Sequence, residues 1–249
     1  MKYPKGWLTY DWNIDGIPAV FEVDLDLYDS APSASHDVLF FVNCISTSLT
    51  ADMTSRAMRA KCESVIRKCL KVSNQQLAGI ISNAEMLQFY TYGTDIHALT
   101  DIEDCIRQSH GIITRVGAQP EPRWQTYMKL LYPDAAKYQT VKNGEQIELM
   151  HRYKDLIYPS RKLSLHVFTK TEPLRLMFEE QARLSGFAIG EAEFDDHSDH
   201  PYGVCLHVVS TLNKPDVDEI TTRVIRLAKQ FEGKLVGWDC AIMKRTKLK

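Results

Sequence analysis

The sequence lacks the short motifs that mark the common nucleotide-binding and hydrolytic sites. None of the patterns G-x-x-x-x-G-K, G-x-G-x-x-G, G-x-S-x-G or H-E-x-x-H occurs in its 249 residues. Each of these motifs supplies the backbone groups, the nucleophile or the metal ligands that its chemistry needs. Their absence argues against a P-loop enzyme, a dinucleotide-binding enzyme, a serine hydrolase and a zinc peptidase, and we expect no cofactor.

Long apolar runs and an excess of basic charge are also missing. The uncharged stretch Val38 to Ala51 contains Asn, Ser and Thr and is shorter than the roughly 20 apolar residues of a membrane helix. The stretch Met1 to Trp7 lacks the apolar run of a signal peptide. With 30 Lys and Arg against 32 Asp and Glu, the chain has no basic excess to attract phosphates. We therefore expect a cytoplasmic protein with no membrane contact and no direct nucleic-acid binding, and we interpret Lys244 to Lys249 as a solvated basic tail.

Cysteine pairs at metal or redox spacing are absent as well. No C-x-x-C pair occurs among the six cysteines, which are Cys44, Cys62, Cys69, Cys105, Cys205 and Cys240. Reduced thiols in a cytoplasmic compartment explain this scatter better than a disulfide framework does. Cys62 and Cys69 fall on the apolar stripe of a predicted helix, so packing in the core is favoured over a catalytic thiol.

The first part of the chain carries alternating apolar and polar residues that predict an antiparallel hairpin. The alternation runs from Trp7 to Leu25 and is interrupted by Asp15-Gly16, a strong hairpin-turn signal. Further periodic segments predict strands at 37–46 and 112–116, a hairpin at 77–92 with its turn at 83–85, and helices at 51–70, 95–108 and 144–155. Residues 1–157 are thus predicted to form an α+β sandwich with an antiparallel sheet and an added N-terminal hairpin.

A Trp-rich beginning and one aromatic segment connect this region to a known family. The segment contains Pro122-Arg123-Trp124-Gln125-Thr126-Tyr127 and ends in Tyr132-Pro133. The stretch from Trp7 to Lys154 resembles the bacterial family known as domain of unknown function 695, whose members begin with such a hairpin and carry a similar Pro-x-Trp-x-x-Tyr…Tyr-Pro segment. The resemblance implies a fold and no mechanism.

The second part of the chain, residues 160–243, predicts strand, helix, strand, strand, helix, strand. The strands are expected at 163–169, 188–194, 204–212 and 235–242, and the second helix near Pro215. The first helix follows Thr171 and is expected to turn Leu174, Met177, Phe178 and Leu184 inward. This order is that of a split βαβ, or ferredoxin-like, sandwich. The change of domain is placed near Tyr158-Pro159, because Pro cannot continue a helix.

The end of this second part carries a further resemblance. Helix two ends in Phe231, and Gly237-Trp238 lies in the last strand. With the element order, this ending resembles the RraB family, the regulators of ribonuclease E activity B, over Lys162 to Ile242. The resemblance implies a non-enzymatic domain that binds ribonuclease E and lowers its activity by protein contact. The acidic tail of that family's best-known form is not present here, where the tail is basic, and charge influences partner choice.

Alternation also predicts which side chains of the second part point away from the helices. If Leu163, Leu165 and Val167 pack under the helices, the neighbouring side chains on strands one, three and four share the open face. That set is His166, Phe168, Cys205, His207 and Asp239. Three interpretations stay open: contact with the other domain or a second copy, binding of a ligand or metal, and acid–base chemistry by His166, His207 and Asp239 at a domain junction.

The tip of the hairpin between strands two and three is acidic and rich in histidine. Its residues are Asp195, Asp196, His197, Asp199 and His200. These side chains include types that divalent metals accept, but a polar hairpin tip is ordinarily solvated. We therefore predict no metal here and interpret the tip as display for a protein partner. Taken together, the sequence favours a two-domain regulatory protein that acts by protein contact, with a ribonuclease as the suggested partner and a homodimer left open.

Overall fold

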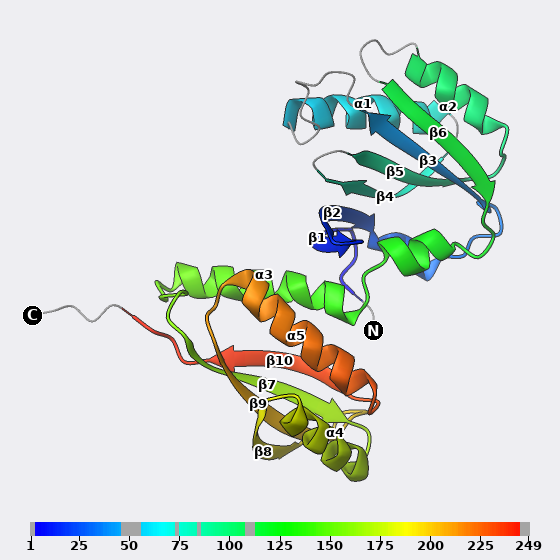
Figure 1. The fold of residues 1–249 in the computed structure, drawn as a ribbon. Coiled ribbons are helices and arrows are strands. Elements are labelled where there is room, and N and C mark those ends of the chain that lie inside the picture. Colours follow the sequence, from blue (N-terminus) through cyan, green and yellow to red (C-terminus); the bar gives the residue numbers. More distant parts are fainter. Residues whose placement is uncertain (1–2, 46–55, 73–74, 84–85, 108–112, 245–249) are drawn as a thin grey trace, which may run out of the picture. The chain divides into compact units, whose positions relative to one another are not determined.

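The computed structural model describes residues 3–45, 56–72, 75–83, 86–107 and 113–244. The chain forms two compact units, Met1–Pro133 and Asp134–Lys249. Each unit combines helices with one antiparallel sheet (Figure 1). The predicted mixed α+β class with two antiparallel sheets is confirmed. Of the predicted turn at 83–85 and the basic tail, residues 84–85 and 245–249 lie outside the described residues.

The first unit contains a six-stranded sheet in the order β1-β2-β4-β5-β3-β6. Its strands are β1 (Trp7–Ile14), β2 (Ile17–Asp24), β3 (Val38–Ile45), β4 (Gln76–Ser82), β5 (Leu87–Gly93) and β6 (Ile113–Pro120). The turn between β1 and β2 has positive φ at Asp15 (50°) and Gly16 (85°), as a tight hairpin turn of this kind requires. The hairpin predicted from alternation is therefore present, with Tyr10, Phe21 and Val23 buried.

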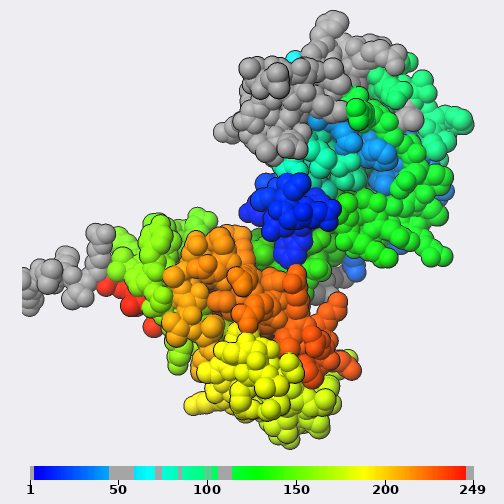
Figure 2. All heavy atoms as spheres, viewed as in Figure 1, coloured from blue at the N-terminus to red at the C-terminus, as the bar shows by residue number. Residues whose placement is uncertain are grey.

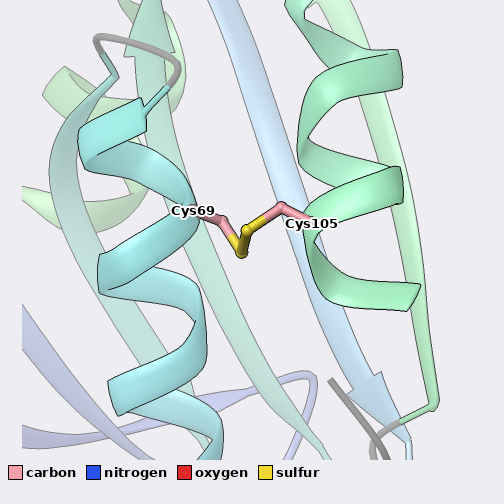
Figure 3. The surroundings of a disulfide bond; sticks show 2 residues. All are labelled: Cys69 and Cys105. Carbon is pink, nitrogen blue, oxygen red and sulfur yellow. A yellow bond between two sulfur atoms is a disulfide. The ribbon is translucent and has the colours of Figure 1, made fainter. Parts of the chain in front are cut away.

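Helices α1 (Arg56–Val72) and α2 (Ala98–Arg107) pack with one face of this sheet. Their neighbouring positions bring Cys69 and Cys105 into a disulfide with a Cα–Cα distance of 5.7 Å (Figure 3). The expectation of reduced thiols is wrong for this pair, because spacing along the chain carries no information on which helices lie side by side. Cys44, Cys62, Cys205 and Cys240 are free thiols.

The aromatic segment after β6 is a structural element of the first unit. Trp124 is fully buried, stacks on Tyr92 with ring centroids 3.8 Å apart, and donates from Nε1 to the carbonyl of His36 at 2.6 Å. Tyr127 lies in a π-helical turn (Thr126–Leu131) and donates to the carbonyl of Asp24 at 2.8 Å. These side chains therefore join β2, β5 and the loop before β3.

The second unit contains a four-stranded sheet in the order β10-β7-β9-β8. Its elements are α3 (Ala135–Arg152), β7 (Arg161–Thr169), α4 (Glu172–Leu184), β8 (Ala188–Phe194), β9 (Tyr202–Ser210), α5 (Lys214–Lys229) and β10 (Lys234–Cys240). All three strand pairs are antiparallel. The predicted sequence of elements from β7 to β10 is thus present.

Helix α3 begins nine residues before the helix predicted at 144–155. Asp134 caps it, accepting from the backbone N–H of Lys137 at 2.9 Å, and Gly144 lies inside the helix, where a Cβ would come 3.3 Å from Lys214 Cε. The helix lies beside α5 (Figures 1 and 2). Because α3 packs on α5, the compact units divide at Pro133 and not near the boundary expected at Tyr158.

A buried hydrogen-bond network joins α3 to the sheet and to α5. Asn143 Oδ1 accepts from Trp238 Nε1 at 2.8 Å, and its Nδ2 donates to Asp218 at 2.8 Å and to Thr221 at 2.9 Å. Gln146 Nε2 donates to the carbonyl of Trp238 at 2.8 Å. Since unpaired polar groups are costly in a core, this network fixes α3 over β10.

The core of the second unit lies between the sheet and helices α3, α4 and α5. Leu163, Leu165 and Val167 of β7 are buried with Trp238 of β10, as alternation predicts. Their partners come from all three helices: Ile147, Met150, Phe178, Ala182, Val217, Val224, Leu227 and Ala228.

On α4 the predicted inward stripe is partly wrong. Phe178 and Ala182 are buried, but Met177 and Leu184 are 57% and 72% exposed. The buried stripe of α4 therefore runs through Phe178 and Ala182, and Met177 and Leu184 lie outside it.

Candidate functional site

The open face of the second sheet is the side of β10-β7-β9-β8 opposite α3, α4 and α5. We use the name open face for the side chains of Ser164, His166, Phe168, Glu193, Cys205, His207 and Asp239. Strand register places them together: His166 pairs with Cys205, Ser164 with His207, and Asp239 with Ser164. The apolar side chains of α3, α4 and α5 pack on the opposite side of the sheet, against Leu163, Leu165 and Val167.

His166 lies at the centre of this face between two carboxylates. Its Nδ1 is 2.6 Å from Glu193 Oε1 and its Nε2 is 2.7 Å from Asp239 Oδ2. The side chains of His166, Glu193 and Asp239 are 30%, 30% and 65% exposed. Burial lowers the pKa of His166, but the hydrogen bonds and charges of Asp239 and Glu193 outweigh burial and raise this pKa above its ordinary value. The arrangement therefore favours a cation at this position.

Cys205 and His207 form a second group beside His166. Cys205 Sγ lies 3.7 Å from His207 Nδ1, and Ser164 Oγ lies 3.3 Å from the same nitrogen. Cys205 is only 7% exposed, and burial raises the pKa of its thiol. The free thiol is thus held protonated unless a cation replaces its proton.

Two glycines make room for the larger side chains of the open face. A Cβ at Gly203 would come within 2.5 Å of the Phe168 ring, and a Cβ at Gly190 would come within 2.5 Å of His207 Nε2. Both distances are far inside van der Waals contact. Larger residues at these positions would displace Phe168 or His207, so the glycines set the shape of this face.

The structure brings together the five side chains that the sequence places here. His166 and Asp239 are in direct contact, Cys205 and His207 are neighbours, and Phe168 lies over Gly203. Sequence reasoning missed Glu193. The register of β8 shifts between Ile189 and Ala192, and such a bulge reverses which side chains point outward. A glycine inside a strand, here Gly190, was the available signal.

The hairpin tip is more constrained than a solvated loop. Asp199 is 2.7 Å from Lys234 Nζ and 2.9 Å from His200 Nδ1. The hydrogen bonds with Lys234 and His200 lower the pKa of Asp199 to about 2. Asp195, Asp196 and His197 are exposed. The tip therefore divides into a part tied to β10 and a part that faces solvent.

Donor atoms of His166, Glu193 and Cys205 lie within 4.8 Å of one another. An imidazole nitrogen, a carboxylate oxygen and a thiolate sulfur are the ligand types of zinc and related transition metals. The open face is thus able to hold a positive charge, either as a proton on His166 or as a metal ion.

Two family models match the chain, one in each of its two compact units. Residues 5–132 match the family described as "Family of unknown function (DUF695)", and residues 160–240 match the family described as "Regulator of ribonuclease activity B". Both resemblances predicted from the sequence are confirmed. The second match contains β7 to β10 and leaves α3 outside.

Other comparisons give no argument about this chain. No curated protein matches it. A crystal structure of an unknown protein from Galdieria sulphuraria is 9% identical, with 83% of this chain and 99% of that chain covered and a TM-score of 0.23. The crystal structure of a putative glycine cleavage system transcriptional repressor is also 9% identical in sequence. That match covers 84% of this chain and 98% of the other chain, with a TM-score of 0.23. These TM-scores are too low to support a shared fold. Among the described helices, none has the length and apolar character to span a membrane.

Proposed function

This chain belongs to the family of unknown function DUF695, which implies no activity, and we propose from its second unit that it is a regulatory protein that acts by binding another protein. The observation that carries the proposal is the match of residues 160–240 to the regulators of ribonuclease activity B. A ribonuclease, and specifically ribonuclease E, is therefore the partner we propose, in the cytoplasm. In the same proposal the unit from β7 to β10 is a ferredoxin-like sandwich, which its element order and strand order support.

The surface we propose for this contact is the open face. Its polar side chains are held in place by short hydrogen bonds within the sheet, so little side-chain freedom is lost on binding. Two carboxylates flank His166, which makes the face unattractive to phosphates and supports a protein partner over RNA. The exposed part of the hairpin tip, Asp195 to His197, is proposed to extend the contact.

A second candidate is acid–base chemistry at the same face. The 2.7 Å contact between His166 and Asp239 favours it, since histidine transfers protons near neutral pH. However, both ring nitrogens of His166 have carboxylate partners, and a general base needs a free lone pair. Protein binding therefore explains the arrangement better.

Titration of the full-length protein with purified ribonuclease E tests the proposal. We expect a saturable complex with a Kd in the micromolar range or tighter and a matching decrease in the rate at which the ribonuclease cleaves RNA. Ribonuclease A serves as a control for general protein contact and RNA competition. Absence of binding at tens of micromolar, or equal inhibition of both enzymes, contradicts the proposal. Sedimentation of the protein alone tests whether a second copy occupies the face instead.

A further inference from the structure

We propose that His166, Glu193 and Cys205 form a binding site for a zinc-type transition-metal ion on the open face. The three residues come from neighbouring strands, β7, β8 and β9, so the sheet itself fixes their backbone positions. Their donor atoms lie within 4.8 Å of one another. This inference does not depend on the identity of the protein partner.

Side-chain adjustments of up to roughly 1–1.5 Å bring the donor atoms, which lie within 4.8 Å of one another, to tetrahedral spacing. With metal bonds of about 2.0–2.3 Å in a tetrahedron, ligand atoms lie about 3.3–3.8 Å apart. His166 Nδ1 and Glu193 Oε1 are now 2.6 Å apart, so they have to separate by roughly 0.8 Å. The ion would take the place of the proton that this hydrogen bond shares, and the Cys205 thiol would release a second proton.

Asp239 has the position of a supporting residue. It contacts Nε2 of His166 at 2.7 Å, while Glu193 is on the Nδ1 side. A metal-bound histidine usually donates its other N–H to a carboxylate, which orients the ring and strengthens its bond to the metal. The same His166 ring therefore has a ligand position on one edge and an orienting carboxylate on the other.

The mixture of ligands selects the class of ion. Ca²⁺ and Mg²⁺ prefer oxygen ligands alone, whereas a thiolate with an imidazole favours Zn²⁺ and other late transition metals. Three protein ligands leave one tetrahedral position open. His207 lies beside one of the three ligands, with Nδ1 3.7 Å from Cys205 Sγ.

Metal titrations of the full-length protein test the site. With Zn²⁺ we expect one calorimetric binding event per chain. With Co²⁺ as a spectroscopic probe, we expect a thiolate-to-cobalt charge-transfer band that Zn²⁺ abolishes. His166→Ala, Glu193→Gln and Cys205→Ser should each weaken binding by at least about tenfold, and Asp239→Asn by about 10-fold or more. Only Cys205→Ser should remove the charge-transfer band while cobalt still binds.

Matched controls separate this site from other ligands of the chain. His197→Ala removes an exposed hairpin-tip histidine, and Cys240→Ser removes another free thiol; both should leave affinity within about twofold. If Cys205→Ser does not fold, Glu193→Gln carries the test, because it changes a half-exposed side chain without changing its size. Absence of stoichiometric binding overturns the proposal, as does binding that the His166 and Glu193 variants leave unchanged.

Discussion

The two units place the rings beside their carboxylates in opposite environments. In the first unit Glu121 accepts from Tyr92 and from Thr126 Oγ1, and its aromatic neighbour Trp124 is fully buried. In the second unit Glu193 and Asp239 also bond to a neighbouring ring, but that ring, His166, is 30% exposed. The aromatic segment of the first unit therefore serves the fold, whereas the open face of the second unit presents polar groups to solvent.

Truncating the aromatic segment should produce the largest loss of stability. Trp124→Ala removes a buried ring, its stacking on Tyr92 and its hydrogen bond to His36, so we expect a loss of about 3–5 kcal/mol. Urea unfolding of the full-length protein measures it. Trp7→Ala is the matched control, because Trp7 is 44% exposed and its removal should cost far less. A loss for Trp124→Ala as small as that for Trp7→Ala would show that the segment is not a core element.

In the second unit the same contrast should appear between its two faces. Trp238→Ala removes a buried ring on the helix side and one of the two donors to Asn143 Oδ1, the other being Gln139 Nε2, so we expect a loss of about 3–5 kcal/mol. His207→Ala on the open face should change stability by less than about 0.5 kcal/mol. Thermal unfolding followed by circular dichroism compares the two. Equal small effects would mean that the two faces of the sheet are assigned the wrong way round.

A smaller loss is expected at the junction of α3 with the sheet. Asn143→Ala leaves the buried Trp238 N–H unpaired, at a cost of about 1–3 kcal/mol. Glu148→Ala on the same helix removes only an exposed ion pair with Arg152, worth about 0–1 kcal/mol.

A protein of residues 134–249, which contains α3, should be more stable than one of residues 160–249, which lacks it. Equal stability of the two fragments would show that α3 contributes nothing to this unit.

Sequence reasoning succeeded where the signal was local. Alternation follows directly from the period of a strand, so the sequence predicts the β1–β2 hairpin and the buried side chains of β7. The open-face residues followed from the same rule applied to β7, β9 and β10. Their proximity then depended only on strand order.

The missed features depend on geometry that is not local. Glu193 was missed because a bulge reverses the faces of β8. The disulfide was missed because Cys69 and Cys105 are separated by 36 positions and only the packing of α1 beside α2 joins them. Helix α3 begins nine residues before the predicted start at Gly144, which lies inside the helix near Lys214.

The smallest expected effect concerns the hairpin tip. Lys234 and His200 lower the pKa of Asp199 to about 2, so Lys234→Ala should raise this pKa part of the way to about 3.9, its ordinary value. A depressed pKa means that the contact stabilises the fold above the ordinary value and that this stabilisation is lost as the pH falls through about 2. Titration of the Asp199 carboxyl carbon by NMR measures the shift. An unchanged pKa would show that the tip is not tied to β10.

The most direct test of the account measures ribonuclease E binding to variants of the two surfaces of the second unit. His166→Ala alters the open face, and Leu176→Ser alters an exposed apolar residue on the outer side of α4. Both variants should keep the native unfolding midpoint within a few degrees, because both side chains are partly or largely exposed. The account predicts at least about tenfold weaker binding for His166→Ala, equivalent to about 1.4 kcal/mol, and an unchanged Kd for Leu176→Ser. Weaker binding for Leu176→Ser with native affinity for His166→Ala would contradict it.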